Sequence, residues 1–194
     1  MNEPNHVNSE KNFLRDYSII ALDWFIDHMG EDEWEKRRSK IVKNFQQLKN
    51  GMIPPNARKT PPKSLDDYNI TVFNKDKIAW YMYLIENWKK RPECDEPFQS
   101  SRIGPFFSAI GYFKSQLEQV NNLNTKLDEL LKSNRNNPDS VIFELLVATC
   151  YVRNGFKVEF IPEAPPQKTP DLKVSKLGRT FEVECKRMDK TTGY

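Results

Sequence analysis

Charged and apolar residues alternate through the run Phe-Glu-Val-Glu-Cys-Lys that begins at Phe181. Strict alternation predicts a β-strand whose charged side chains share one face. Glu184 and Lys186 are then neighbours on that face, with Cα atoms about 6–7 Å apart. Asp171, which follows a proline, brings a second carboxylate from a preceding strand. Two carboxylates beside an ammonium can hold a divalent metal next to a proton-transfer group, and this combination suits hydrolysis of a phosphodiester.

Another acidic residue, Glu144, lies upstream in the apolar stretch Phe-Glu-Leu-Leu of a predicted helix. A helix that is apolar on nearly all sides is buried, and an unpaired buried carboxylate costs several kcal/mol. One explanation is that the buried Glu144 carboxylate has a functional partner, which removes this cost. The alternative is that Glu144 faces solvent near the start of its helix, favoured by the helix dipole and paired with Lys132 or Arg135.

The order and context of these residues resemble the PD-(D/E)xK nuclease superfamily, the fold of many restriction endonucleases and Holliday-junction resolvases. The resemblance covers residues 140–187. It implies an α+β fold, in which a helical N-terminal region precedes a helix and a three-stranded antiparallel meander. The implied helix is Ser140–Asn154, and the implied strands are Phe156–Ile161, Thr169–Ser175 and Arg179–Arg187.

The same resemblance assigns the family's acidic and basic positions to Glu144, Asp171, Glu184 and Lys186. It implies Mg²⁺ or Mn²⁺ as the cofactor. The metal ligands would be Asp171, Glu184 and the backbone carbonyl of Cys185, with Glu144 binding directly or through water. Lys186 would orient or deprotonate the attacking water, or stabilise the transition state. The resemblance leaves open whether the site binds one metal ion or two.

Each of these residues also has an ordinary structural interpretation. A proline followed by Asp171 can simply open a strand, and Glu184 with Lys186 can form the solvent face of an edge strand. Glu182 shares the predicted face and is the rival carboxylate, but the family spacing Glu-x-Lys favours Glu184. A hairpin through Gly178 would bring Asp171 towards Glu184.

Upstream of residue 135 the chain is predicted to be helical. Apolar residues at three- and four-residue spacings predict helices at Phe13–Met29, Asp32–Lys49, Lys75–Lys90 and Pro105–Lys132. Four prolines make residues 52–64 an extended connector. The predicted organisation is therefore a helical region at 1–135 and a nuclease-like region at 136–194, although the second region alone holds only a marginal core.

Eight residues follow Lys186, too few for the helix and strand that close the family's sheet. We therefore expect a fragment of a longer enzyme; the alternatives are a sheet covered by another subunit of a homo-oligomer or by the N-terminal helices. The 194-residue chain is then expected to be weakly active or inactive. The alternative function is a helical interaction or assembly module that carries a degenerate nuclease-like remnant.

The composition limits which partners and which cellular locations are expected for the chain. The chain has 30 Lys and Arg against 27 Asp and Glu, a net charge of +3, which permits a DNA partner (or, less readily, RNA) without demanding one. Three widely spaced cysteines argue against a disulfide framework and indicate a cytoplasmic location. No apolar run is long enough to cross a membrane. The basic cluster around Arg37 and Arg38 is interpreted as a solvated helix face, with phosphate binding as the alternative.

Overall fold

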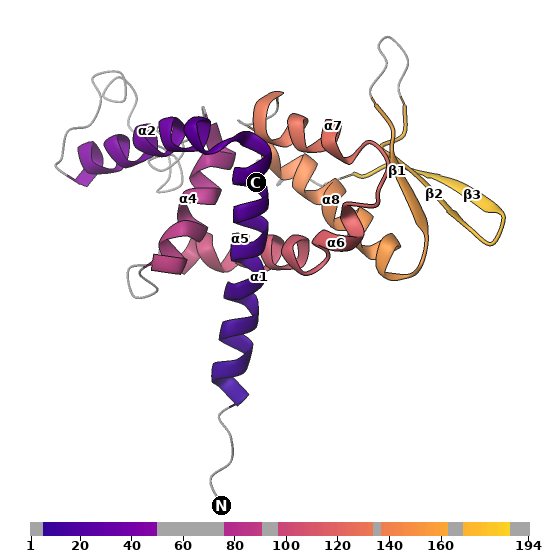
Figure 1. The fold of residues 1–194 in the computed structure, drawn as a ribbon, viewed down its shortest axis with the longest axis horizontal. Helices are drawn as coiled ribbons and strands as arrows, with labels where there is room; N and C mark the ends of the chain where they lie inside the picture. The colour runs from indigo at the N-terminus through magenta and orange to yellow at the C-terminus, as the bar shows by residue number, and fades with distance from the viewer. Residues whose placement is uncertain (1–5, 50–75, 91–96, 134–136, 163–168, 187–194) are drawn as a thin grey trace, which may run out of the picture.

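The computed structural model describes residues 6–49, 76–90, 97–133, 137–162 and 169–186. Within them the fold is α+β, with helices followed by a three-stranded antiparallel sheet at one end of the molecule (Figure 1). The predicted connector at 52–64 lies outside the described residues. None of the described helices has the length and apolar character needed to cross a membrane.

The first three predicted helices are confirmed as α1 (His6–Met29), α2 (Glu31–Lys49) and α4 (Lys77–Lys90). Helix α1 ends at Gly30, whose φ of 93° lies in the left-handed region that terminates helices. The chain therefore turns sharply into α2 (Figure 1).

The predicted continuous helix Pro105–Lys132 is wrong. The structure instead divides the segment into α5 (Pro97–Tyr112), α6 (Lys114–Leu117), α7 (Leu123–Asp128) and a π-helical turn, η4 (Glu129–Ser133). The main break precedes α7, where Asn122 has a φ of 62°, a left-handed conformation that Asn tolerates. Helical spacing of apolar residues continues across the break, so periodicity alone could not reveal it.

Helices α1 and α5 pack together unusually closely. A Cβ atom added at Gly111 of α5 would lie 1.9 Å from the carbonyl oxygen of Tyr17 in α1. Only glycine fits at such an approach of two backbones. Helix α5 is thereby fixed against α1, and it also contacts α8 on the way to the sheet.

The predicted helix and the predicted three-stranded meander are present in the predicted order. They are α8 (Pro138–Arg153), β1 (Lys157–Phe160), β2 (Leu172–Lys176) and β3 (Arg179–Val183), with strand order β1-β2-β3. Both strand pairs are antiparallel. Strand β3 ends at Val183, earlier than predicted, so Glu184–Lys186 follow the strand instead of forming part of it.

Alternation along the strands sends one face of the sheet into the core. Val158 and Phe160 of β1 and Leu172 and Val174 of β2 are buried, and they pack with residues of α8. The cross-strand partner of Leu172 is Val183, which is half-buried. The sheet and α8 therefore share one apolar core with the helices that precede them.

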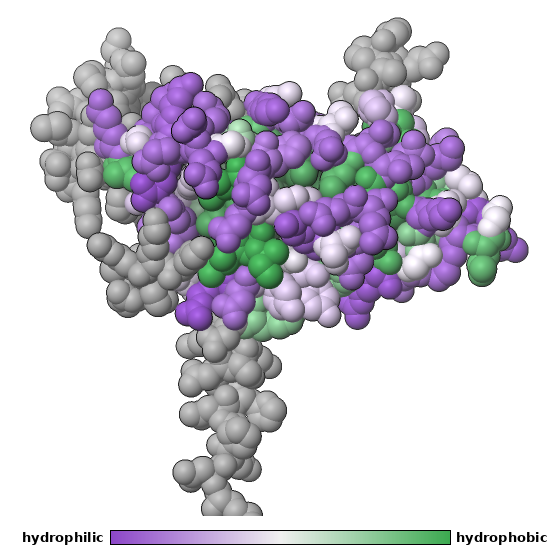
Figure 2. All heavy atoms as spheres, viewed as in Figure 1, coloured by the Kyte–Doolittle hydropathy of each residue, from purple (hydrophilic) through white to green (hydrophobic). Residues whose placement is uncertain are grey.

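The basic cluster on α2 is not simply a solvated face. Arg37 is 4% exposed; its guanidinium pairs with both carboxylate oxygens of Asp76 and donates a hydrogen bond of 2.7 Å to the Leu131 carbonyl. Arg38 pairs with Glu86 of α4 at 2.6 Å. These arginines tie α2 to α4 and η4, while hydrophilic residues cover most of the face drawn in Figure 2.

Candidate functional site

Helix α8 directs Glu144 inward, where the residue is only 8% exposed. Its carboxylate oxygen Oε2 lies 2.6 Å from Nζ of Lys126 on α7. The sequence offered Lys132 or Arg135 as partners, but Lys132 pairs with Asp128 and Arg135 lies outside the described residues. Glu144 is therefore buried as predicted and does not face solvent as in the alternative, and its partner Lys126 is a residue that sequence reasoning missed.

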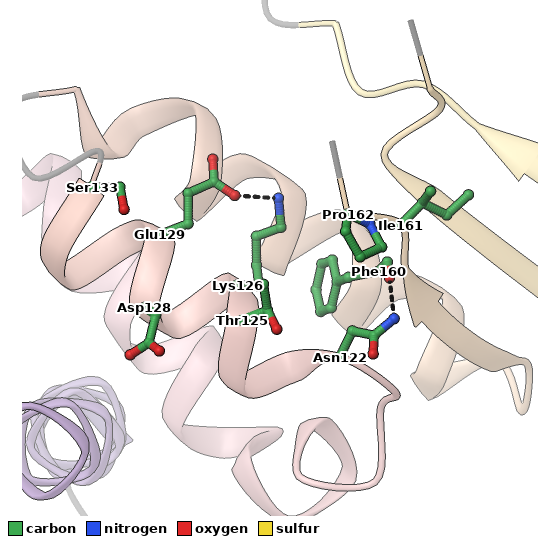
Figure 3. A pocket seen from close by; sticks show the side chains of 9 residues that line it. All are labelled: Asn122, Thr125, Lys126, Asp128, Glu129, Ser133, Phe160, Ile161 and Pro162. Atoms are coloured by element: carbon green, nitrogen blue, oxygen red, sulfur yellow. Dashed lines mark hydrogen bonds and ion pairs between the residues drawn. The ribbon is translucent and has the colours of Figure 1, made fainter. Parts of the chain in front are cut away.

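Lys126 joins three elements around its ammonium group. Nζ lies 2.7 Å from Oε2 of Glu129 and 5.7 Å from the ring centroid of Phe160, which places it over an aromatic face as well as beside two carboxylates. Figure 3 shows the Lys126 side chain rising from α7 beside the Phe160 ring and ending at Glu129. No sequence motif marks this lysine, because α8 and β1 reach it only through the tertiary fold.

The pKa shifts indicate that the carboxylates of Glu129, Glu144 and Asp171 lie near one another, and we call this cluster the acidic corner. Burial raises the pKa of Glu144; the Lys126 ammonium works against that rise, while the charges of Asp171 and Glu129 add to it. For Lys126, burial lowers the pKa, but its two ion pairs outweigh that effect and the pKa is raised. Asp171, the residue before β2, thus lies close enough to act electrostatically on Glu144.

Asp171 immediately precedes β2, which begins three residues later than the predicted strand Thr169–Ser175, and it is bonded to both neighbouring segments. Its N–H donates to the Val183 carbonyl at 3.0 Å, and its own carbonyl accepts from the N–H of Ile161 at 3.0 Å. Its carboxylate oxygen Oδ2 accepts a hydrogen bond of 2.5 Å from the backbone N–H of Cys185. The Asp171 side chain therefore reaches across to the chain that leaves β3.

The thiol of Cys185 is affected by the same carboxylates. Burial, together with the negative charges of Asp171 and Glu144, raises the pKa of its thiol to about 12. The thiol packs against the core, as the predicted alternation with Val183 requires. Glu144, Asp171 and Cys185 thus come together although they lie on three separate segments.

The other two predicted residues turn outward. The side chains of Glu184 and Lys186 are 41% and 76% exposed, and Lys186 Nζ lies 3.7 Å from Glu184 Oε1. The register pairs Leu172 with Val183, so a continuation by one residue would set Asp171 opposite Glu184. The rival carboxylate, Glu182, is paired in register with Lys173 inside the ladder, a pairing of opposite charges.

An open pocket of about 460 Å³ adjoins the Lys126 side of this corner (Figure 3). Polar side chains of α7 and η4 line it on one side and the end of β1 on the other: Asn122, Thr125, Lys126, Asp128, Glu129, Ser133, Phe160, Ile161 and Pro162. The amide Nδ2 of Asn122 donates to the Phe160 carbonyl at 2.8 Å, which fixes the pocket floor to the sheet.

The donors available to a metal are hard oxygen atoms. Within the described ranges, no three His, Cys, Asp or Glu side chains form a group arranged to hold a metal ion. The predicted ligand set uses two carboxylates, from Asp171 and Glu184, and the main-chain carbonyl of Cys185. Carboxylate and carbonyl oxygens with water completing the shell match the preference of Mg²⁺ and Mn²⁺. The donor types match such an ion, but the described residues do not bring three acidic, His or Cys side chains together around one position.

Comparison with known proteins adds no family to this picture. No protein-family model, curated protein or solved structure matches the chain.

Proposed function

We propose that this chain carries the site of a metal-dependent nuclease that hydrolyses phosphodiester bonds in DNA. The observation that carries the proposal is the meeting of Glu144, Asp171 and Cys185 at one corner. Asp171 accepts from the Cys185 N–H, and the charges of Asp171 and Glu144 both act on the Cys185 thiol. Residues from a helix, from the segment before β2 and from the segment after β3 rarely share a polar corner without a functional or pairing requirement.

In this proposal each residue has a distinct task. Asp171, Glu184 and the Cys185 carbonyl hold a Mg²⁺ or Mn²⁺ ion, and Glu144 supports it directly or through water. Lys186 orients the attacking water or takes its proton, and its exposure leaves it accessible to a phosphate. The bound ion supplies Lewis-acid stabilisation of the charge that grows on the phosphate.

Metal binding is the first test, because it does not depend on a complete catalytic sheet. Titration of the chain with Mn²⁺ by calorimetry should show binding that Asp171→Ala weakens strongly. Lys173→Ala is the matched control, since Lys173 lies on β2 two residues after Asp171, is exposed and is outside the ligand set. Absence of binding in the wild-type chain would favour the alternative, a helical assembly module with a nuclease-like remnant.

Cleavage is the second test. Plasmid, linear and single-stranded DNA, with RNA as a separate arm, are incubated with and without Mg²⁺ or Mn²⁺. Lys186→Ala should lose at least about 100-fold in cleavage rate but keep substrate binding, because proton transfer acts on the transition state. Cleavage that persists in EDTA, or full activity of Lys186→Ala, would exclude the assignment.

A further inference from the structure

The turn between β2 and β3 exposes a leucine in a backbone conformation that leucine rarely adopts. Leu177 has a φ of 50°, in the left-handed region, and the residue is 93% exposed. Figure 1 shows the hairpin projecting beyond the helices, and Figure 2 shows hydrophobic atoms at its outer end. Because no packing compensates the strained backbone, the position suggests a side chain kept for contact with a partner.

Two exposed cations flank this leucine on the hairpin itself. Lys176 precedes the turn, Arg179 follows it, and the two residues are paired in the register of β2 and β3. The tip of the hairpin therefore presents one apolar side chain between two positive charges.

The connection from α8 to β1 brings further cations to the same end of the sheet. Lys176 Nζ donates a hydrogen bond of 2.5 Å to the Asn154 carbonyl and lies 5.1 Å from the ring centroid of Phe156. Arg153 and Lys157 stand on either side of that connection, and both are exposed. The hairpin and the connection therefore form one basic surface.

Acidic residues do not offset this basic surface. The sequence contains no Asp or Glu between Glu144 and Glu159, and none between Asp171 and Glu182. Within the described ranges, no carboxylate forms an ion pair with any of the four cations. The surface is therefore complementary to a polyanion, although the whole chain carries a net charge of only +3.

Duplex DNA matches both parts of this surface. Exposed lysine and arginine side chains bind phosphates and release the counterions condensed on them. Proteins that enter the minor groove often place an apolar side chain there, leucine among them, against the base pairs. An exposed leucine between two cations combines these two kinds of contact.

We propose that the tip of the β2–β3 hairpin is a contact point for double-stranded DNA. Lys176 and Arg179 bind phosphates, and Leu177 enters the minor groove between them. The inference rests on the proposed function, because it names the form of DNA that the nuclease site would receive. Six residues separate Asp171 from Leu177, about 20 Å at the strand rise, which corresponds to about six base pairs of duplex.

The leucine is tested by fluorescence anisotropy with a labelled DNA duplex in EDTA, where metal-dependent cleavage cannot interfere. Leu177→Asn should weaken binding about tenfold, because it removes the apolar contact. The same substitution relieves the backbone strain, so the variant should unfold no earlier than the wild type and a lost fold cannot explain the weaker binding. Leu177→Met, which keeps a large apolar side chain, should bind like the wild type.

The cations are tested through the salt dependence of binding. Arg179→Ala should reduce the slope of log affinity against log salt concentration by about 1, as the loss of one phosphate contact requires. Lys43→Ala is the matched control, because Lys43 is an exposed cation on α2, at the opposite end of the molecule (Figure 1). It should leave the slope unchanged.

Wild-type affinity in Leu177→Asn, or an unchanged salt slope in Arg179→Ala, would overturn the inference. Single-stranded DNA or duplex RNA that binds as tightly as duplex DNA, with the same sensitivity to Leu177→Asn, would overturn the choice of duplex DNA.

These outcomes are separate from those of the proposed function. Duplex binding that depends on Leu177, in a chain that neither binds Mn²⁺ nor cleaves DNA, would support the inference and defeat the nuclease proposal. Metal-dependent cleavage of duplex DNA, with unchanged affinity in Leu177→Asn, would overturn the inference and leave the nuclease proposal standing.

Discussion

Burial makes the Glu144 carboxyl harder to ionise, and Lys126 opposes that effect. A carboxyl whose folded-state pKa lies above its ordinary value binds protons more readily in the folded state than in the unfolded state. Stability contributed by that group is present at low pH and is lost as the pH rises through the raised pKa. The Lys126 ammonium reduces this loss of folding stability, so its charge contributes most to stability at neutral pH.

Removal of the Lys126 charge should therefore have a pH-dependent cost. Lys126→Met should destabilise the chain by about 3 kcal/mol at pH 7, the usual penalty for leaving a buried charge without its partner. The penalty should shrink towards acid pH, where Glu144 becomes protonated. Urea denaturation in EDTA at pH 4.5 and pH 7 measures it.

The same substitution at Lys36 is the control, because its ion pair with Glu33 is exposed. Lys36→Met should change stability by less than about 0.5 kcal/mol at either pH. A Lys126→Met penalty that is constant across this range would contradict the assigned role of Glu144.

Cys185 offers a chemical probe of the same corner. With a thiol pKa of about 12, almost no thiolate exists at pH 8, so alkylation by iodoacetamide should be slow. Cys150, which is exposed, should react much faster. Peptide mapping by mass spectrometry resolves each cysteine separately.

Asp171→Asn should accelerate labelling of Cys185, because it removes a carboxylate that raises the thiol pKa. Lys173→Ala, on the adjacent strand, should not. Equal labelling rates at Cys185 and Cys150 would show that Cys185 lies in a different environment from the one described.

At the scale of elements, sequence reasoning was most successful where a local pattern determined the structure. Period-two alternation predicted the third strand, and glycine at position 178 predicted the hairpin before it, because both signals lie within a few residues of the element they specify. The break before α7 was missed, since main-chain bonds between Asn121 and β1 stabilise it and these bonds are tertiary. Lys126 was missed for the same reason.

The β2–β3 turn combines a favourable residue with an unfavourable one. Leu177 and Gly178 have φ values of 50° and 74°, and they connect the paired residues Lys176 and Arg179. Two consecutive positive φ values define the type I′ hairpin turn, in which Asn-Gly is the preferred pair. Leucine is strained in this conformation, and its side chain is 93% exposed, so packing does not compensate.

Leu177→Asn should therefore stabilise the chain by about 1 kcal/mol, which raises the unfolding midpoint by about 2–4 °C for a protein of this size. Leu177→Ala is the matched control, because it removes the exposed apolar side chain but keeps the backbone strain. Differential scanning calorimetry compares the two. Equal midpoints for both variants would show that strain at this position is not the cause.

At the scale of the whole molecule, contacts cross the boundary predicted near residue 135. Lys126 neutralises Glu144 from the other side of it, and Asn121 is joined to β1 by a parallel bridge. The boundary between 1–135 and 136–194 remains a prediction, but these contacts argue that the second part depends on residues of the first.

A fragment that starts at residue 137 should consequently fail to fold, whereas one that starts at residue 113 should retain more structure. The shorter fragment leaves Glu144 buried without its cation and removes the neighbour of β1. Amide chemical-shift dispersion in a two-dimensional NMR spectrum distinguishes the two. A well-dispersed spectrum for residues 137–194 would establish an autonomous domain.

The bridge between Asn121 and β1 also affects local unfolding of the sheet. The Asn121 N–H donates to the Val158 carbonyl, and its carbonyl accepts from the N–H of Phe160. Although Asn121 lies in a loop between two helices, its amide proton can exchange with solvent only when the edge of the sheet separates. In hydrogen-exchange measurements this loop amide belongs to the cooperative unit of the sheet, and its protection reports the sheet's opening free energy.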